Sequence, residues 1–251
     1  MTSAKKYTTC LLDMDGVLAE VSQSYRAAIL ATCHHYGAKS VTQDTIADWK
    51  ARGGCNNDWK LSLDLISASP DGRKDGLTLD QVTETFEKFY QGDGDTKGFC
   101  DTESLIPARE TLQALAKRST GGKLGIVTGR PRSDCIKFLK QHNLEHLIHS
   151  SVCMEDGPPK PDPFPVLECC KLMGVAPSET VILVGDTPDD VRAALAAGCR
   201  AIGVATPEAA TEAKTNGEPF DSSKLCVAMK ECGVDAILRP GFAELIDMFQ
   251  S

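Results

Sequence analysis

The sequence predicts an α/β protein in which helices cover both faces of a parallel sheet and an all-helical segment is inserted after the first strand. Two observations predict this fold. Short apolar runs alternate with helical stretches in the second half of the chain, as they do in βαβ units. About a hundred residues with helical patterns separate the first strand from the second, which is too long for one crossover connection.

The first strand is predicted over residues 7–12, an apolar run of the kind favoured when both faces are buried. It ends in Asp13 and Asp15, at the strand end where ligands of open α/β sheets bind. Gly16 permits a sharp turn there, and two like charges so placed repel unless a cation lies between them. Taken alone, the Asp-x-Asp pattern could equally cap a helix or lie in a solvated turn.

The insert is predicted to be a helical cap domain of residues 19–100, with the core formed by residues 1–18 and 101–251. A Gly-rich acidic stretch at 92–98 predicts a loop or hinge. Because the insert leaves the sheet directly after the acidic pair, we expect it to act as a lid that excludes water. Its helices are predicted at residues 22–36, 42–52, 58–67 and 79–90.

The core continues with alternating strands and helices. Further strands are predicted at residues 123–128, 147–152, 180–185, 199–204 and 234–238. Helices are predicted at residues 107–118, 131–142, 163–174, 188–197, 221–232 and 241–249.

Composition narrows the class of protein. A net charge of −8, with 35 acidic and 27 basic residues and no long basic run, argues against a nucleic-acid binder. The chain has no run of apolar residues long enough to span a membrane, and residues 1–6 lack the apolar core of a secretion signal. We therefore expect a soluble, cytoplasmic protein without membrane or nucleic-acid partners.

Eleven cysteines are present, an odd number without any C-x-x-C spacing. This pattern argues against a disulfide framework and against a zinc site. We expect reduced thiols, with those in apolar segments acting as small hydrophobic side chains.

Two further segments carry polar groups that could meet an anion. Thr128 and Gly129 follow a predicted strand and precede a helix opened by Pro131, so a hydroxyl and a backbone N–H are available there. Helix capping would explain the same residues. Lys160 lies in the proline-stiffened loop 157–163, where a solvated lysine is the ordinary alternative.

A fourth segment ends another buried strand with a carboxylate. Asp186 comes directly at the strand end, and Asp189 and Asp190 lie on the first turn of the next helix. Acidic residues on the first turn of a helix can simply complement the helix dipole. This explanation suits Asp186 less well, because Asp186 stands directly at the strand end. Together, the four segments predict carboxylates, one hydroxyl and one ammonium group on the same edge of one sheet.

These segments resemble the four motifs of the haloacid dehalogenase-like hydrolase superfamily, and the resemblance spans the whole chain. It is closest to the branch with a helical cap inserted between the first and second motifs, which includes phosphoglycolate phosphatase-like enzymes and β-phosphoglucomutase. The resemblance implies a Rossmann-like core and a Mg²⁺-dependent phosphatase acting on a small phosphate monoester. The matching residues are Asp13-Met14-Asp15-Gly16-Val17-Leu18, Thr128-Gly129-Arg130, Lys160-Pro161-Asp162-Pro163 and Gly185-Asp186-Thr187-Pro188-Asp189-Asp190.

The resemblance also implies roles for individual residues. Asp13 is expected to be the nucleophile that forms an aspartyl-phosphate. Asp15 is expected to protonate the leaving oxygen and then to activate water. Thr128 and the N–H of Gly129 would hold the phosphoryl oxygens, and Lys160 would offset their charge.

The implied cofactor is Mg²⁺, which prefers oxygen ligands and keeps several waters. Its ligands would be the carboxylates of Asp13 and Asp186 and the backbone carbonyl of Asp15. Asp190 is expected to support the metal ligands without binding the ion itself, and Asp189 is the alternative candidate for that role. The implied partner is a small phosphorylated metabolite, and we expect a monomer or a homodimer.

Other functions share parts of this pattern. Dehalogenases of the family carry a non-acidic residue where this chain has Asp15, so dehalogenation is not expected. A phosphosugar mutase would use the same core residues, and the motifs do not exclude it. A phosphoacceptor signalling domain also gathers acids, a hydroxyl and a lysine, but such domains are about half this length and lack a helical insert. A catalytically dead binding module would lack a motif residue, and none is missing.

The cap must supply substrate specificity, and residues 52–59 are the best candidates. Gly53 permits a tight loop, Arg52 could bind a second anionic group, and Asn56 and Trp59 offer a hydrogen bond and a stacking face. The alternative is a structural turn between helices, with Asn56 or Asn57 as N-cap and Trp59 in the core of the cap. The sequence leaves both interpretations open.

Overall fold

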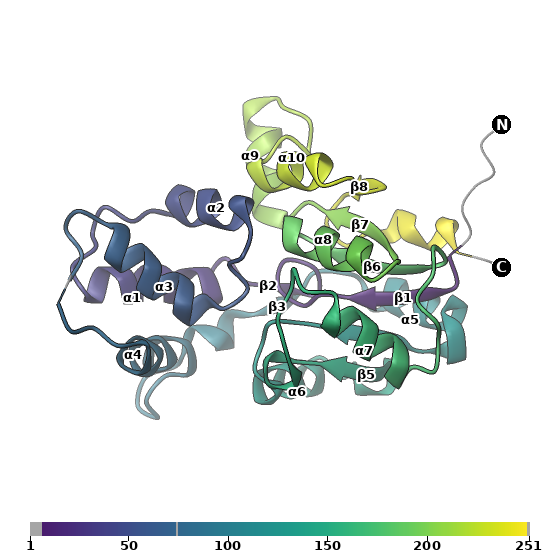
Figure 1. Cartoon of the computed structure of the whole chain (residues 1–251), viewed down its shortest axis with the longest axis horizontal. Helices are drawn as coiled ribbons and strands as arrows, with labels where there is room; N and C mark the ends of the chain where they lie inside the picture. Colours follow the sequence, from purple (N-terminus) through teal and green to yellow (C-terminus); the bar gives the residue numbers. More distant parts are fainter. Residues whose placement is uncertain (1–6, 74, 250–251) are drawn as a thin grey trace. The chain divides into compact units, whose positions relative to one another are not determined.

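The computed structural model describes residues 7–73 and 75–249. The chain forms two compact units, one made of the residues up to Ala19 together with those from Leu105 onward, the other made of Glu20–Ser104 (Figure 1). The predicted cap limits of 19–100 stay a prediction. Residues 1–6, for which no secretion signal is expected, lie outside the described residues.

The larger unit is built on a six-stranded parallel sheet with the order β5-β4-β1-β6-β7-β8. Every residue of β1, β4 and β6 is buried, as expected when helices cover both faces of a parallel sheet. The predicted α/β class is confirmed, and all the predicted core strands are present. The strands are β1 (Thr9–Leu12), β4 (Leu124–Val127), β5 (Ile148–Val152), β6 (Val181–Gly185), β7 (Arg200–Val204) and β8 (Ala236–Leu238).

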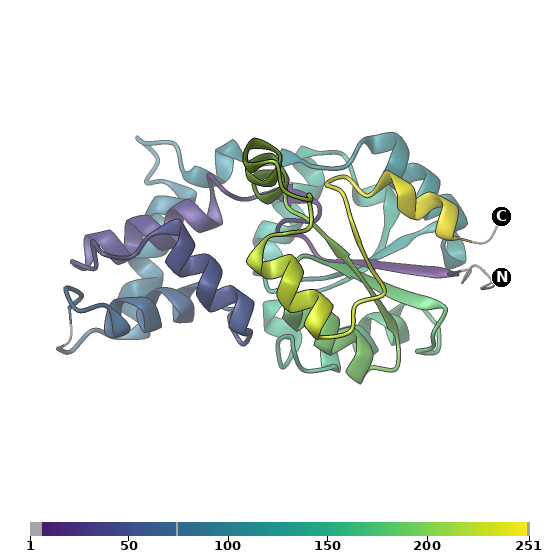
Figure 2. The same ribbon diagram turned by 90° about the horizontal axis from the view of Figure 1, so that it is seen from above.

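Helices lie on both faces of this sheet (Figure 2). On one face α7 and α10 each contact α8, and Leu11 and Leu183 of the sheet pack in one apolar cluster with Val166, Val191 and Met229 of these helices. The opposite face carries α5 and α6. The helices of this unit are α5 (Arg109–Arg118), α6 (Arg132–Gln141), α7 (Phe164–Leu172), α8 (Pro188–Ala196), α9 (Pro207–Asn216) and α10 (Lys224–Glu231).

The structure differs from the sequence prediction at two helices. Helix α9 was not predicted, because only Ala213 in it is buried and it therefore has no apolar face to detect. The helix predicted at 241–249 is a 3₁₀ helix of six residues, a geometry that is used mainly in short pieces. The 3₁₀ helices are η1 (Phe99–Thr102), η2 (Thr120–Gly122), η3 (Glu145–Leu147), η4 (Met154–Asp156) and η5 (Ala243–Met248).

The smaller unit is helical, and the four α-helices among its described residues match the four predicted helices. Tyr25 packs with its ring centre 4.2 Å from that of Tyr90, and Phe86 lies beside both. Thr42 and Thr78 close capping boxes at two helix starts. The short strands β2 (Ala19–Glu20) and β3 (Ser104–Leu105) pair with each other where the chain enters and leaves this unit. The helices are α1 (Tyr25–His35), α2 (Gln43–Arg52), α3 (Asp58–Ala68) and α4 (Leu79–Gln91).

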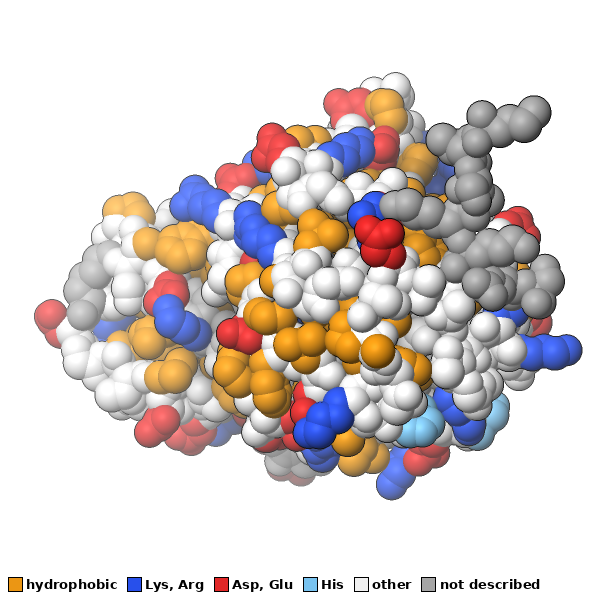
Figure 3. Space-filling view, turned by 45° about the vertical axis from the view of Figure 1, so that its right-hand side comes forward, with side chains coloured by type: hydrophobic (Ala, Val, Ile, Leu, Met, Phe, Trp, Pro, Cys, Tyr) orange, Lys and Arg blue, Asp and Glu red, His pale blue; other side chains and the backbone are white. Residues whose placement is uncertain are grey.

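Several large hydrophobic side chains remain on the surface of the larger unit. They include Leu167 and Leu172 of α7, Leu195 of α8 and Val227 of α10, each more than a third exposed. Figure 3 shows hydrophobic side chains in orange near the middle of the view, with charged side chains above and below them. Within the described residues, no helix combines the length and the apolar character needed to cross a membrane.

Candidate functional site

The polar residues that follow the central strands lie at one edge of the sheet. Backbone pairing continues past the strand ends, since Asp13 N donates to Val184 O at 2.9 Å and Thr128 N donates to Val152 O at 3.0 Å. Asp186 directly follows β6, the neighbour of β1. Asp13, Thr128 and Asp186 therefore emerge at the carboxyl ends of neighbouring strands, where ligands of open α/β sheets bind.

Three carboxylates form the centre of this edge. Asp13, Asp186 and Asp190 each offer an oxygen, and these oxygens lie within 4.8 Å of one another. All three side chains are buried. Burial raises the pKa of the Asp13 carboxyl well above its usual range; Lys160 opposes this shift, and the neighbouring acids add to it. Grouped carboxylate oxygens of this kind fit a hard divalent cation, which would offset the repulsion among them.

Lys160 joins two of these acids. Its Nζ lies 2.9 Å from Asp13 Oδ1 and 2.5 Å from Asp190 Oδ1, and it donates to the backbone oxygen of Val127 at 3.2 Å. Burial favours the neutral amine, but the two carboxylates outweigh it and raise the pKa of Lys160 above its usual value. The loop lysine is therefore a buried cation within the cluster rather than a solvated side chain.

Two glycines let the acidic side chains approach the backbone closely. Gly16 has a φ of +72°, and a Cβ added there would lie 2.2 Å from Asp186 Oδ2. A Cβ added to Gly185 would lie 2.2 Å from the Cβ of Asp190. Any side chain at position 16 would thus collide with the carboxylate of Asp186, and it would also strain the backbone.

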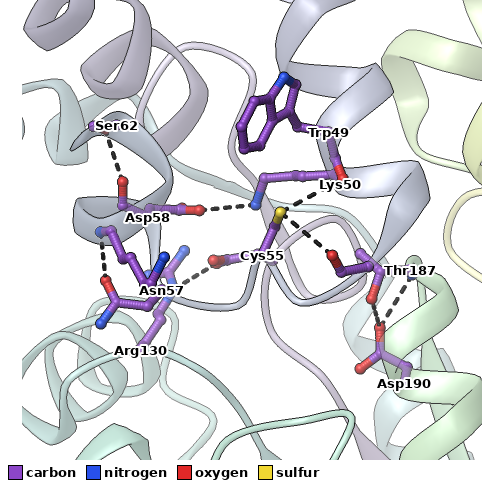
Figure 4. Close-up of polar contacts among 12 residues, drawn as sticks. Trp49, Lys50, Cys55, Asn57, Asp58, Ser62, Arg130, Thr187 and Asp190 are labelled. Atoms are coloured by element: carbon purple, nitrogen blue, oxygen red, sulfur yellow. Dashed lines mark hydrogen bonds and ion pairs between the residues drawn. The ribbon is translucent and has the colours of Figure 1, made fainter. Parts of the chain in front are cut away.

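The two acids at the start of α8 have different surroundings. Asp190 Oδ2 accepts from the hydroxyl of Thr187 at 2.6 Å and from its backbone N–H at 3.1 Å (Figure 4), while its other oxygen contacts Lys160. Asp189 pairs with Arg192 at 3.2 Å. Only Asp190 of this pair belongs to the group of three carboxylates.

The second motif forms a tightly bonded turn. The hydroxyl of Thr128 accepts from the backbone N–H of Arg130 at 3.1 Å, so its own proton can be donated to a phosphoryl oxygen. Gly129 lies between them and is half-buried. Arg130 reaches the first motif, with its Nε donating to Asp15 Oδ1 at 2.6 Å. Sequence reasoning gave Arg130 no role, although it stands next to two predicted phosphate ligands.

In the smaller unit, Arg52 ends α2 and is exposed. Its guanidinium lies over the ring of Trp49, 5.7 Å from the ring centre. Gly53 follows with a φ of 88°, a conformation that favours glycine. Lys50 pairs with Asp58 at 2.9 Å and so joins α2 to α3 (Figure 4).

The start of α3 is capped by Asn57, whose Oδ1 accepts from Lys60 N at 2.9 Å. The structural interpretation of this segment expected Asn56 or Asn57 to be the N-cap, and the N-cap is Asn57. Trp59 is half-buried, and its Nε1 donates to Glu87 Oε1 at 2.9 Å. Through Asp58 and Trp59, this segment joins α3 to α2 and to α4. The Arg52 side chain remains exposed.

The sequence model of one family covers most of the chain. It is the model of the haloacid dehalogenase-like hydrolases, and it matches residues 10–204. This chain belongs to that family. It is an enzyme of a hydrolase family, and its four motifs lie within or beside the structural site described above.

Phosphatases are among the sequence relatives of this haloacid dehalogenase-like hydrolase. A phosphoglycolate phosphatase from Haemophilus influenzae is 27% identical over 201 residues, which cover 76% of this chain and 83% of the relative. A solved structure assigned to the same family, from Bacteroides fragilis, has a TM-score of 0.71 at 23% identity and covers 96% of this chain and 100% of its own. The structural likeness supports the fold alone.

A third relative is more similar in sequence but much longer. An imidazoleglycerol-phosphate dehydratase from Phytophthora nicotianae is 42% identical over 238 residues, which cover 95% of this chain but only 51% of the relative. The chain therefore spans about half the length of that protein.

Proposed function

We propose that this hydrolase is a Mg²⁺-dependent phosphatase that removes the phosphoryl group from a small phosphate monoester through an aspartyl-phosphate on Asp13. The observation that carries the proposal is the ammonium group of Lys160, held 2.9 Å from Asp13 Oδ1 beside two further buried carboxylates. An anionic nucleophile that must meet an anionic ester needs positive charge nearby.

Asp13 is the nucleophile of the proposed reaction. An oxygen of its carboxylate attacks phosphorus, the bond from phosphorus to the ester oxygen breaks, and the phosphoryl group is transferred to Asp13. Lys160 neutralises charge on the nucleophile and on the transferred group. The hydroxyl of Thr128 and the N–H of Gly129 hold the phosphoryl oxygens in line with Asp13.

Asp15 acts as the general acid in the first step and as the general base in the second. It gives a proton to the departing ester oxygen, and the resulting carboxylate then takes a proton from the water that hydrolyses the aspartyl-phosphate. This double use favours turnover over retention of the phosphate, so it argues for a phosphatase rather than for a phosphoacceptor signalling domain.

Asp13 and Asp186 would hold the metal ion with the backbone carbonyl of Asp15, and Asp190 would support them. When bound, Mg²⁺ supplies positive charge to the phosphoryl oxygens and fixes their orientation. Because three buried carboxylates face one buried lysine, the residues present leave an excess of negative charge that suits a divalent cation.

Two relatives support two candidate substrate classes. Phosphorylated small carboxylic acids are favoured by the phosphoglycolate phosphatase, and the exposed Arg52 could bind their second anionic group. The relative from Phytophthora nicotianae adds phosphate esters that carry an imidazole ring, because this chain matches about half of a protein named for such a compound. Both classes belong in the first substrate panel.

The test is phosphate release from p-nitrophenyl phosphate and a panel of small phosphate esters, with Mg²⁺ and with a chelator. Repeated turnover that requires the metal is expected, and Asp13→Asn should abolish it because this substitution removes the nucleophile at nearly constant size. A single stoichiometric phosphorylation without turnover would favour the signalling domain. Conversion of one phosphosugar isomer to another without phosphate release would favour the mutase.

A further inference from the structure

We propose that Arg130 is the positioning residue for Asp15. It would hold the acid–base carboxylate in the place from which it serves the ester oxygen. The inference rests on the proposed function, in which Asp15 protonates the leaving group, and it adds a residue that affects catalysis through Asp15. None of the roles assigned above to the four motifs includes this side chain.

The contact between Arg130 and Asp15 is short, and its two side chains differ in their exposure to solvent. Arg130 Nε lies 2.6 Å from Asp15 Oδ1, and the side chain of Arg130 is 1% exposed whereas that of Asp15 is 29% exposed. The guanidinium stays charged at any pH at which the protein is folded. A buried, permanent cation thus meets a carboxylate that is still open to solvent and to a substrate.

The arginine is fixed by more than this ion pair. Its backbone N–H donates to the hydroxyl of Thr128 at 3.1 Å, and its backbone oxygen accepts from Met154 N at 3.0 Å. The guanidinium lies over the ring of Phe138 at 5.4 Å from the ring centre, an arrangement that suits an arginine more than a lysine. The anchor is therefore held by both its backbone and its side chain.

Asp15 has less support of its own. It lies in the turn that follows β1, where Gly16 N donates to Ala19 O at 2.9 Å and where the side chain remains partly exposed. A carboxylate in such a turn can adopt several rotamers. The contact with Arg130 selects one of them, and small displacements of a catalytic group can be costly in rate.

A positioning role differs from a purely structural role in its dependence on the leaving group. The leaving group of p-nitrophenyl phosphate is p-nitrophenolate, a weak base that needs little protonation. The leaving group of an alkyl phosphate is an alkoxide, a strong base that needs a well-placed acid. If Arg130 acts through Asp15, its loss slows alkyl esters much more than the nitrophenyl ester. If it only stabilises the fold, both esters lose activity in the same proportion.

The experiment is a double-mutant cycle with Asp15→Asn and Arg130→Gln, measured on p-nitrophenyl phosphate and on an alkyl phosphate that the wild type hydrolyses. Arg130→Gln is expected to lower kcat/KM for the alkyl ester by about tenfold or more, with a smaller loss for the nitrophenyl ester. In the double variant, Arg130→Gln should cost nothing beyond Asp15→Asn, since the group through which it acts is gone.

Arg132→Gln is the matched control. Arg132 lies two residues away, is partly exposed and pairs with Asp156 rather than with Asp15, so its substitution should leave the ratio between the two esters unchanged. If Arg130→Gln does not fold, as judged by thermal unfolding, Arg130→Lys replaces it. The lysine variant should show the same preferential loss on the alkyl ester, because an ammonium group lacks the planar fork of the guanidinium.

Equal losses on both esters, or independent and additive effects of the two substitutions, would overturn the proposal for Arg130. The proposed function is judged separately by Asp15→Asn. If that variant shows no preferential loss on the alkyl ester, then Asp15 is not the general acid. That result would contradict the proposed mechanism, and it would be distinct from a failure of the positioning role of Arg130.

Discussion

Lys160 Nζ lies 2.9 Å from Asp13 Oδ1 and reaches Asp190 with the same nitrogen. One ammonium group thus connects the end of β1 with the start of α8, two segments that lie far apart in the sequence. Removing one partner of a buried ion pair leaves an uncompensated charge, which typically costs about 3–5 kcal/mol.

Lys160→Met is expected to lower kcat by about a hundredfold or more, because a positive charge next to the transferred group is lost. The variant should also unfold at a lower temperature than the wild type when a chelator is present, since Asp13 and Asp190 then repel each other without their shared cation. Thermal unfolding with and without Mg²⁺ measures this, and the metal should restore part of the loss. Wild-type turnover in this variant would contradict the role of Lys160.

Gly16→Ala is expected to abolish activity and to weaken metal binding. The added Cβ would lie 2.2 Å from Asp186 Oδ2, so the carboxylate must move. Gly121→Ala is the matched control, because Gly121 has nearly the same φ, +71°, but no atom within 4 Å of an added Cβ. Both variants share the backbone strain of about 1–2 kcal/mol, so a difference in activity between them isolates the collision with Asp186. Equal activity in the two variants would count against a tight approach of these residues.

Asp189 and Asp190 are distinguished by isosteric substitution. Asp190→Asn should raise the Mg²⁺ concentration needed for half-maximal activity by about 10- to 100-fold, because Asp190 lies in the carboxylate group and contacts Lys160. Asp189→Asn should leave this concentration unchanged, since Asp189 pairs with Arg192. Titration of activity with Mg²⁺ measures both. The reverse order would assign the supporting role to Asp189.

Arg52→Ala and Trp59→Phe are expected to change the ranking of substrates. Arg52 is exposed and could meet a second anionic group, and Trp59→Phe removes the N–H that donates to Glu87. At least one of the variants should shift the ratio of kcat/KM between two esters by about tenfold, equivalent to 1.4 kcal/mol, without altering the dependence on Mg²⁺. Lys60→Ala on the exposed side of α3 is the control. An unchanged ranking would place specificity elsewhere in the smaller unit.

The core strands can be predicted well because the residues within each strand carry the signal. Buried parallel strands such as β6 are continuous apolar runs, and each is bounded by glycine, proline or polar residues. The two-residue strands β2 and β3 are too short to leave a pattern. Helix α9 lacks an apolar face, yet its Thr206 cap, its first-turn Pro207 and its left-handed Gly217 are recognisable start and stop signals.

The candidate site is predictable in its parts but not in its contacts. Each motif residue at a strand end follows from position alone, since parallel strands end at one edge. Lys160 meets Asp190 from 30 positions away, and Arg130 reaches Asp15 across 115 positions. Both contacts depend on packing that no local pattern encodes. The close approach of Gly16 to Asp186 likewise requires the folded sheet.

The place of β1 in the sheet bears on how the protein is made. This strand is synthesised before both of its neighbours, β4 and β6, so one of its edges stays open until Gly185 has been added. An apolar strand with unpaired backbone groups is a site for association with other chains. Nascent chains that stop before β6 should therefore depend on chaperones and aggregate without them, whereas chains that extend past it can bury their central strand.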